Sequence, residues 1–218
     1  MNLAEKYRPQ TYADVIGQAS VIATIDRLRP RGLGGRSWWI WGHRGQGKTS
    51  IAELLASELA SDLSVKGYNG AELTEPLIQD LEKNSGLFGF GDKHGRAFIV
   101  DEAHRLTTGA VGQLLTTLET GNIPKHVIWI FTTTEKGQAA LLKRVDDAAP
   151  LIARSVDLKL TSRGLCELFA KHCKRIAEIE ELDGRPIGDY ERLAKSKKND
   201  CRAMLQAVEQ GAMLPDSH

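Results

Sequence analysis

The sequence predicts an α/β domain with a parallel five-stranded sheet flanked by helices, followed by a small all-helical domain. Three observations lead to this prediction. Short apolar runs of strand length alternate with stretches of helical periodicity as far as residue 160. A glycine-rich turn joins the first of these runs directly to a helix. Beyond this region the pattern is only helical, so we place the boundary between domains 1–161 and 162–218.

Composition adds few constraints. The chain has 218 residues and a formal net charge of +1, so no global basic field indicates nucleic acid, although local basic patches are compatible with this balance. No apolar stretch approaches the roughly 20 residues of a membrane span, and residues 1–9 lack the apolar core of a signal peptide. We therefore expect no membrane contact and a cytoplasmic location, which includes association with the nucleoid. The cysteines, Cys166, Cys173 and Cys201, lack metal-ligand spacing and are expected to be reduced and packed in the protein.

The amino-terminal part precedes the first predicted strand. Residues 1–20 are expected to form an extended arm with a turn at Arg8-Pro9-Gln10. Residues 21–28 fit a short amphipathic helix, which Pro30 ends. Residues 37–41 contain three tryptophans and one isoleucine, a bulky apolar run that forms the first strand of the predicted sheet.

A glycine-rich loop follows this strand. It reads Gly42-His43-Arg44-Gly45-Gln46-Gly47-Lys48-Thr49, a glycine, four residues and then Gly-Lys-Thr. The glycines allow a tight turn whose N–H groups point inward, and a helix that begins near Lys48 adds the positive end of its dipole. Lys48 can reach the β- and γ-phosphates, and the Thr49 hydroxyl can ligate Mg²⁺. We therefore predict that residues 42–49, with Ser50 after them, bind ATP.

The remaining elements follow in the order expected of an alternating α/β sheet. Strands are predicted near 63–66, 97–100, 127–131 and 158–160. Helices are predicted at 50–60, at 72–83, and from a cap at Thr107 or Thr108 to Thr120. Residues 165–176, 190–194 and 201–208 carry the helical pattern of the second domain.

Two acidic residues end the third predicted strand. Ala97 to Val100 is a continuous apolar run, as expected of a strand buried on both faces, and Asp101 and Glu102 follow it. Open α/β sheets bind ligands at the carboxyl ends of their strands. Asp101 is therefore a candidate Mg²⁺ ligand, and Glu102 a candidate to orient or deprotonate the attacking water. A solvated strand end is the alternative, but the phosphate loop upstream favours the catalytic interpretation.

Three separated motifs, taken in order, resemble the sliding-clamp-loader group of AAA+ ATPases, which includes replication factor C small subunits and bacterial DNA polymerase III clamp-loader ATPases. They are the phosphate loop, the opening stretch from Asn2 to Gln18, and Leu114 to Glu119 with His126 to Glu135. The resemblance covers about residues 2–210. It implies a P-loop AAA+ fold with a helical lid, Mg²⁺-dependent ATP hydrolysis, and assembly of identical or homologous subunits into a ring or spiral.

The resemblance assigns roles to matching residues. Tyr7, Val15 and Ile16 would line the adenine pocket, with Arg8 near the phosphates. Thr134 matches the sensor-1 position, which senses the γ-phosphate.

Two further roles follow from the same resemblance. Arg202 resembles the sensor-2 arginine of the lid. Asn69 would hold Glu102 in a resting pose, and an ordinary turn asparagine is the alternative.

The family also supplies an arginine to the neighbouring subunit's active site. Arg154 leads into the last predicted strand, as the family arginine does, and is our candidate for this role in trans. Arg144 is the rival candidate. An arginine supplied in trans can accelerate hydrolysis by about 10³–10⁵.

The chain departs from the family pattern at two points. Many bacterial relatives carry a four-cysteine zinc module between the phosphate loop and the acidic strand, whereas residues 61–96 contain no cysteine, so we predict no zinc. The family's third, helical collar domain also has no counterpart in this sequence. Either the collar has been removed or the chain is a minimal relative that assembles in another way.

The resemblance implies primed or duplex DNA as a partner, and a sliding clamp as a further one. DNA contacts would go to phosphates, for which helix N-termini are suited. Thr107 and Thr108 open the helix after the acidic strand, Arg105 nearby adds positive charge, and these three residues are the candidates. Plain helix capping is the alternative role of the threonines.

Other functions remain open at this point. The chain could bind ATP only as a structural subunit, or it could belong to another DNA-remodelling group of AAA+ ATPases, recombination-associated or of branch-migration type. Asp101-Glu-Ala-His104 matches a sequence motif of one group of helicases. Such helicases need two RecA-like domains, and no second one fits in this chain.

Overall fold

The computed structural model describes residues 2–119 and 121–215, and its contacts divide the chain into two compact units. The sheet unit contains Ser20–Gly42 and Lys48–Leu160. The helical unit contains the chain up to Ala19, His43–Gly47 of the glycine-rich loop, and the chain from Thr161 onward.

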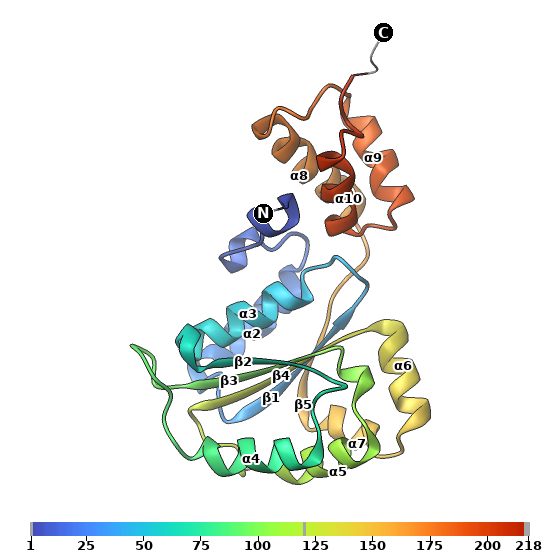
Figure 1. Ribbon diagram of the computed structural model, residues 1–218. Coiled ribbons are helices and arrows are strands. Elements are labelled where there is room, and N and C mark those ends of the chain that lie inside the picture. Colours follow the sequence, from blue (N-terminus) through green and yellow to red (C-terminus); the bar gives the residue numbers. More distant parts are fainter. Residues whose placement is uncertain (1, 120, 216–218) are drawn as a thin grey trace. The chain divides into compact units, whose positions relative to one another are not determined.

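The sheet unit has the predicted parallel five-stranded sheet. Its strands are β1 (Arg36–Gly42), β2 (Val65–Asn69), β3 (Arg96–Asp101), β4 (Val127–Thr134) and β5 (Ser155–Lys159). They lie in the order β2-β3-β4-β1-β5, and every pairing is parallel (Figure 1). β1, β3 and β4 are buried along nearly their whole length, which explains their continuous apolar sequences.

Helices cover both faces of this sheet. Figure 1 shows α2 (Ala19–Leu28) and α3 (Lys48–Leu59) on one face, and α4 (Glu75–Ser85), α5 (Thr108–Thr117) and α7 (Ala148–Ala153) on the other. The remaining α-helix described in this unit, α6 (Glu135–Arg144), follows β4 directly. Every helix in the described part of the chain lacks the length and apolarity needed to cross a membrane.

Aromatic side chains fill the core between the sheet and α4 and α5. Trp39 stacks on Phe131 with ring centroids 5.4 Å apart, and Phe98 lies 4.6 Å from Trp129. Burying a large side chain of this kind stabilises the fold by about 1.5–3 kcal/mol. The indole N–H of Trp39 donates to Gln138 at 2.9 Å, so the buried polar atom is satisfied.

The helical unit packs three helices against the amino-terminal segment. They are α8 (Leu165–Ile179), α9 (Ile187–Ser196) and α10 (Cys201–Glu209), and their shared core includes Phe169, Cys173 and Met204. Leu3, from the short helix α1 (Leu3–Lys6), is part of the same core. Gln18 links the segment to the start of this unit, because its side-chain amide exchanges hydrogen bonds with the backbone of Thr161 at 2.9 and 3.2 Å.

The structure differs from the sequence analysis in the first residues. The expected extended arm contains α1 and a 3₁₀ turn, η1 (Tyr12–Asp14), and it groups with the helices rather than with the sheet. The physical reason is the burial of Leu3 among the helices, a contact between residues far apart in sequence.

Several element boundaries also differ from the predictions. β2 begins at Val65 rather than Leu63, because Asp62–Ser64 forms a 3₁₀ turn that leaves Leu63 exposed. α4 starts three residues later than predicted, and α5 ends at Thr117, before the predicted end at Thr120, which lies outside the described residues. α6 and α7 were not predicted.

Candidate nucleotide-binding site

The predicted site residues of the sheet unit gather at one edge of the sheet. Gly42 at the end of β1 pairs with Thr134 at the end of β4, and Asn69 at the end of β2 pairs with Asp101 at the end of β3. Because all five strands are parallel, this is the carboxyl edge, where open α/β sheets bind ligands.

The glycine-rich loop has the backbone that a phosphate cradle needs. Gly45 and Gly47 have φ angles of +66° and +91°, which other residues rarely adopt. His43 donates its N–H to the side-chain oxygen of Gln46 at 2.9 Å, and this bond closes the turn. α3 begins at Lys48, as predicted, and the Lys48 ammonium donates to the carbonyl of Gly42 at 3.2 Å.

Two further features of this loop bear on ligand binding. The Gln46 side chain is buried, and its amide nitrogen has no hydrogen-bond partner in the part of the chain that the structure describes. Such an orphaned donor fits a loop whose ligand is an anion. Of the other predicted loop residues, His43 and Arg44 are exposed, Thr49 is half-buried and Ser50 is buried.

The tip of the loop contacts α10 within the helical unit. The Cys201 N–H donates to the carbonyl of Gly45 at 3.3 Å. A Cβ on Gly45 would lie 2.0 Å from a carboxylate oxygen of Asp200, the residue that caps α10. Glycine is therefore needed at this position for close approach as well as for φ. Arg202, the predicted sensor-2 residue, is exposed one position after this contact.

Asp101 is held at one carboxylate oxygen only. Its Oδ1 accepts hydrogen bonds from the hydroxyl of Thr132 and from the Glu102 N–H, the latter at 3.0 Å. No donor among the described residues reaches Oδ2. One carboxylate with a free oxygen fits Mg²⁺, which usually takes one or two carboxylates together with phosphate oxygens and water. Residues 2–119 and 121–215 contain no cluster of three or more His, Cys, Asp or Glu side chains that could hold a metal without such help.

Glu102 lies beside Asp101 in a strained conformation. Its φ of 51° is left-handed, a conformation that costs about 1–3 kcal/mol for most residues and recurs at active sites. Its carboxylate accepts hydrogen bonds from Arg105 at 3.0 Å and from Asn69 at 3.3 Å. Arg105 first, and then Asn69, lower the pKa of Glu102 below its ordinary value. The structure thus brings together the Asn69–Glu102 pair that the resemblance implied.

The three threonines at the end of β4 have different partners. Thr132 is buried and bonds Asp101. Thr133 lies 3.1 Å from the ring nitrogen Nδ1 of His104. Thr134, the predicted sensor-1 residue, caps α6 by accepting the Gly137 N–H at 3.0 Å. The sequence analysis missed Thr132, because its role depends on the register between β3 and β4, which the sequence alone does not give.

The two candidate arginines are in different situations. Arg144 donates to the backbone carbonyls of His104 and Leu106 at 3.0 and 2.6 Å. Arg154 caps α7 and is exposed, and no partner for its guanidinium occurs in the described part of the chain. Of the two guanidinium groups, that of Arg154 is therefore the one exposed without a partner among the described residues.

The candidate DNA-contact residues lie at or just before the start of α5. Thr107 is its N-cap and accepts the Ala110 N–H at 3.2 Å, so the capping role holds for this residue. Thr108 is exposed, and Arg105 is the partner of Glu102 described above.

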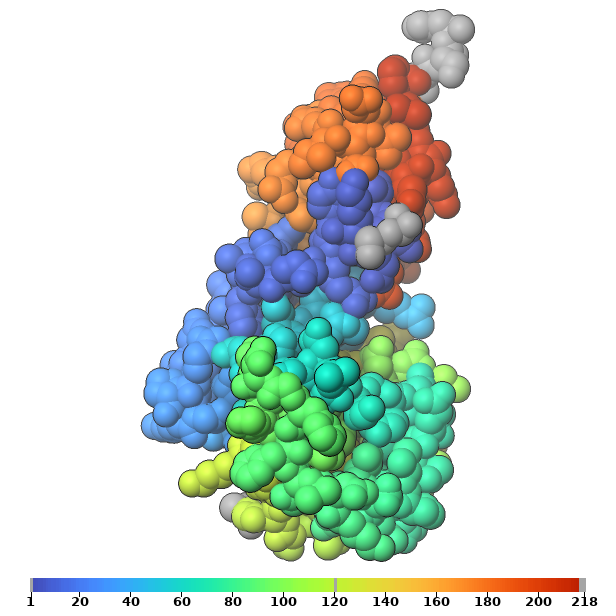
Figure 2. Space-filling view, turned by 60° about the vertical axis from the view of Figure 1, so that its left-hand side comes forward, coloured from blue at the N-terminus to red at the C-terminus, as the bar shows by residue number. Residues whose placement is uncertain are grey.

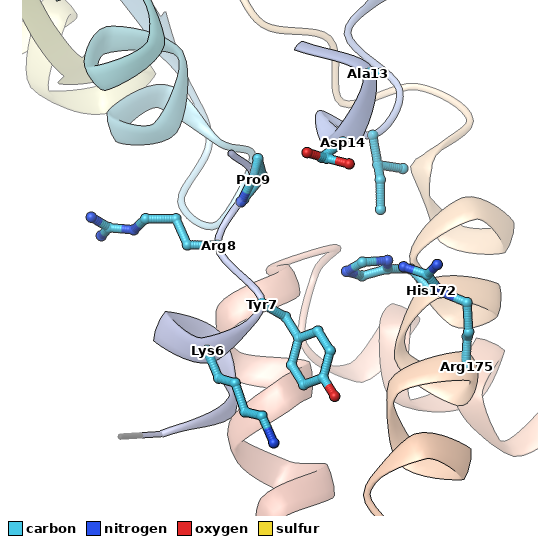
Figure 3. Close-up of a pocket in the computed structure, with 9 residues that line it drawn as sticks. Lys6, Tyr7, Arg8, Pro9, Ala13, Asp14, His172 and Arg175 are labelled. Atoms are coloured by element: carbon cyan, nitrogen blue, oxygen red, sulfur yellow. The ribbon is translucent and has the colours of Figure 1, made fainter. Parts of the chain in front are cut away.

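A cavity of about 360 Å³ lies inside the helical unit, and Figure 3 shows it. Its lining includes Tyr7, Arg8 and Ile16 of the predicted adenine pocket, whereas Val15 is buried outside this lining and faces Gly47. The other lining residues are Lys6, Pro9, Ala13, Asp14, His172 and Arg175.

Charged groups define the chemistry of this cavity. His172 and Arg175 come from α8, and the sequence analysis did not single them out. Burial, and secondarily Arg175, lowers the pKa of His172. The Tyr7 hydroxyl donates to Glu180 and so fixes its ring at the cavity wall (Figure 3).

Comparison with known proteins identifies the family. The profile described as "ATPase family associated with various cellular activities (AAA)" matches residues 39–151, which include the phosphate loop and the acidic strand. The chain belongs to the AAA family. Its expected P-loop fold with a helical carboxyl-terminal part is confirmed.

Among curated proteins, this AAA chain is similar to DNA polymerase III subunits. It is 30% identical over 240 residues to the subunit gamma of Buchnera aphidicola subsp. Acyrthosiphon pisum, an alignment that covers 99% of the chain and 63% of the relative. It is 27% identical over 190 residues to the subunit gamma of B. aphidicola subsp. Baizongia pistaciae, covering 77% and 49%. It is 30% identical over 164 residues to the subunit gamma/tau of Mycobacterium tuberculosis, covering 62% and 27%. The chain thus spans less than two thirds of each of these relatives.

Solved structures share the fold at lower identity. The RuvB Holliday junction branch migration motor of Thermotoga maritima matches with a TM-score of 0.66 and 20% identity, over 93% of this chain and 64% of that chain. A DNA polymerase III gamma subunit-related protein of the same organism matches with a TM-score of 0.59 and 17% identity, over 88% and 58%.

Proposed function

We propose that this AAA chain binds ATP with Mg²⁺ and hydrolyses it, as a clamp-loader-type subunit that acts on DNA. The observation that carries the proposal is the arrangement at the carboxyl edge of the sheet. There, Lys48 begins a helix after a positive-φ glycine loop, Asp101 keeps one oxygen free, and Glu102 lies next to it. These parts together suit positioning and charge stabilisation, on which phosphoryl transfer mainly depends.

Each residue would contribute a separate step. The loop N–H groups and Lys48 would bind the phosphates, and Thr49 and Asp101 would hold Mg²⁺, which when bound supplies charge neutralisation. Glu102 would orient the attacking water and accept its proton, for which it must be ionised, as a carboxyl whose pKa is at or below its ordinary value is at neutral pH. Thr134 and Arg202 would sense the γ-phosphate. The helical-unit cavity would take the adenine, with Tyr7 and Ile16 at its wall.

Steady-state ATP turnover tests this function, measured with and without primed DNA at a concentration that allows assembly. We expect turnover that primed DNA stimulates and that Glu102→Gln abolishes while nucleotide binding persists. If the native chain shows no turnover under assembly conditions, and Glu102→Gln changes nothing, the structural ATP-binding role is correct instead. Stimulation by a four-way junction in place of primed DNA would indicate a branch-migration type of motor.

The trans role of Arg154 has its own test. Arg154→Ala protomers keep an intact nucleotide site, whereas Lys48→Ala protomers have a dead site but an intact Arg154. Each variant alone should be inactive, and a mixture should regain turnover, because Lys48→Ala protomers supply Arg154 to the sites of their neighbours. The control mixes Arg144→Ala protomers with Lys48→Ala protomers in the same way. Arg144 serves as the control because its side chain already donates to backbone carbonyls of its own chain. Failure of the mixture to recover would remove Arg154 from this role.

The biological setting is also part of the proposal. We also propose a ring or spiral of identical or homologous subunits, a cytoplasmic location, and primed DNA and a sliding clamp as partners, as the sequence resemblance implies. The relatives named as DNA polymerase III subunits support a role with DNA. Arg105 and Thr108 remain the candidate phosphate contacts. The test measures DNA affinity and its dependence on salt concentration in Arg105→Ala and Thr108→Ala. If both quantities are unchanged, these residues do not contact DNA phosphates.

A further inference from the structure

His104 ends the Asp101-Glu-Ala-His104 sequence, and the proposed reaction leaves it without a role. It lies in a 3₁₀ turn, η4 (Ala103–Arg105), directly after Glu102, and its side chain is half-buried. Its ring nitrogen Nδ1 lies 3.1 Å from the hydroxyl oxygen of Thr133 near the end of β4. The ring therefore connects the turn that follows the acidic strand with the end of the neighbouring strand.

Helix α6 contacts η4 from both its first and its last turn. In the first turn, an added Cβ on Gly137 would lie 2.6 Å from Cγ of His104, so the imidazole ring lies directly against the Gly137 backbone. In the last turn, Arg144 donates to the carbonyls of His104 and Leu106 at 3.0 and 2.6 Å. A shift of the first turn of α6 would therefore reach η4 through the ring of His104.

The first turn of α6 begins beside the phosphate-binding loop. Thr134 pairs in the sheet with Gly42, and the Lys48 ammonium donates to the carbonyl of the same Gly42 at 3.2 Å. This places the end of β4 next to the ammonium that would bind the phosphates. The Thr134 hydroxyl accepts the Gly137 N–H at 3.0 Å and keeps its own hydrogen to donate. A bond from this hydroxyl to a phosphate would pull on Gly137, and so on the ring of His104.

On its other side, η4 holds Glu102 in its resting pose. Arg105 donates from its guanidinium to the Glu102 carboxylate at 3.0 Å and from its N–H to the Glu102 carbonyl at 2.8 Å. The side chains of this ion pair are both exposed, so the pair is weak and a small shift of η4 is enough to open it. Asn69, which also bonds the carboxylate, comes from β2 and lies outside this turn.

A packing role alone would not need the ring nitrogen of His104. A phenylalanine ring could lie against Gly137 equally well. Among the described residues, the buried Thr133 hydroxyl would then keep only its long bond to the carbonyl of Thr134, at 3.4 Å. The polar contact across β4 and η4 is thus a separate feature from the packing of the ring, and the two can be tested apart.

We propose that His104 is the positioning residue that couples a γ-phosphate at Thr134 to the release of Glu102. The phosphate draws Thr134 and the first turn of α6, and the imidazole ring carries the shift into η4. Arg105 then leaves Glu102, which turns toward the attacking water. With ADP the pair of Arg105 and Glu102 stays closed, because the γ-phosphate that distinguishes the two states is missing. The inference rests on the proposed function, since it needs ATP in the site.

Hydrogen exchange of residues 103–106, followed by mass spectrometry, measures the state of η4 without requiring turnover. The chain is compared with Mg²⁺ and ADP and with Mg²⁺ and ATPγS, each at a saturating concentration established by calorimetry. In the native chain we expect exchange about threefold faster with ATPγS, because the weak pair in this segment opens. His104→Phe keeps a ring against Gly137 but cannot bond Thr133, and it should exchange equally with both nucleotides. His104→Asn restores a hydrogen-bonding side chain and should regain the response.

A variant on the opposite side of the contact makes the assignment specific. Thr133→Val should behave like His104→Phe, and the double variant should be no worse than either single one, because both changes remove the same bond. In steady-state turnover, His104→Phe should lower kcat about tenfold and leave KM unchanged, since the ring positions Glu102 and does not bind substrate.

His126→Phe is the matched control. His126 is a half-buried histidine just before β4, at the opposite edge of the sheet, and it bonds the carbonyl of Ser85 at 2.9 Å. Its ring contacts Phe88 of the loop 86–95, which Figure 2 shows in green on the surface of the sheet unit. The response of residues 103–106 to ATPγS should be the same in this variant as in the native chain.

The outcomes separate this inference from the proposed function. If the native chain binds ATPγS but residues 103–106 exchange equally with both nucleotides, or if His104→Phe keeps the response, the inference is wrong and the proposed function stands. Failure of His104→Asn to regain the response also overturns it and assigns His104 to packing alone. If the native chain does not bind ATPγS, the proposed function fails and the inference fails with it.

Discussion

Thr132→Val tests how the candidate magnesium ligand is positioned. Thr132 is fully buried in β4, and its hydroxyl donates to Oδ1 of Asp101 on the neighbouring strand. Valine has nearly the same shape, so the change removes this hydrogen bond and keeps most of the packing. Among the residues that the structure describes, the carboxylate then has one donor left, the Glu102 N–H at 3.0 Å.

The expected magnitude follows from these contacts. A hydrogen bond to a charged group contributes about 1.5–3 kcal/mol, and the exposure of Asp101 lets water replace part of that. We therefore take a value just below this range, about 1.4 kcal/mol, which corresponds to a tenfold change in an equilibrium constant. Partners that orient metal ligands change metal affinity by about 10–100-fold, and the remaining donor again places this case at the lower end. The apparent Mg²⁺ constant should therefore rise about tenfold.

The assay is ATP turnover titrated with Mg²⁺, repeated as Mn²⁺-dependent ADP binding by calorimetry so that the result does not require turnover. Thr133→Val is the control, because the hydroxyl of Thr133 faces His104 rather than Asp101. We expect its metal constant to equal that of the native chain. If Thr132→Val folds normally and its metal constant stays within about twofold of the native one, the hydrogen bond does not position Asp101 and the reasoning is wrong.

Three further changes have defined expected outcomes. Arg105→Ala removes the main cause of the lowered pKa of Glu102, so that pKa should rise and the acid limb of the turnover–pH profile should move to higher pH; an unmoved limb would contradict this assignment. Tyr190→Phe removes the hydroxyl that donates to Asp183 at 2.9 Å and should cost about 1–2 kcal/mol of stability, measured by urea unfolding of the helical unit. Burial raises the pKa of Asp183, but hydrogen bonds from Lys174 and Tyr190 outweigh it and lower the pKa overall. The contribution of Asp183 is therefore present above the pKa of an unfolded Asp and is lost as pH falls through the lower folded value, so native and Tyr190→Phe proteins should converge in acid. Gly45→Ala should weaken nucleotide binding, because position 45 has a φ of +66° and an added Cβ would clash with Asp200, the cap of α10. Equal nucleotide affinity of the variant and the native chain by calorimetry would contradict this expectation.

The features predicted from sequence are those that local patterns determine. Continuous apolar runs indicated the buried strands, and the glycine spacing before Lys48 indicated a loop ahead of a helix; both are confirmed in the structure. The chain order of strands and helices then placed Asp101 and Glu102 at the carboxyl edge, because parallel strands share one edge.

The features that were missed depend on contacts between distant residues. Nothing near Leu3 in the sequence shows that it packs with Phe169, so the arm was expected to be extended. The role of Thr132 depends on the register between β3 and β4, which a single strand does not reveal. The start of β2 was predicted two residues too early because Leu63 is apolar, like a strand residue. In the structure Leu63 is exposed in a 3₁₀ turn, which its residue type does not reveal.

The two acidic residues of the site are held by different kinds of contact, and this difference supports different roles for them. Asp101 is held from β4 by the hydroxyl of Thr132, which is itself buried, so one of its carboxylate oxygens has a fixed partner. Glu102 is held from the surface, by Arg105, whose side chain is 53% exposed while that of Glu102 is 43% exposed. Exposed ion pairs contribute only about 0–1 kcal/mol, so Glu102 can leave this pose at small cost. A metal ligand needs a fixed oxygen, whereas a residue that takes a proton from water must be able to turn toward it, and the contacts of Asp101 and Glu102 match these two requirements.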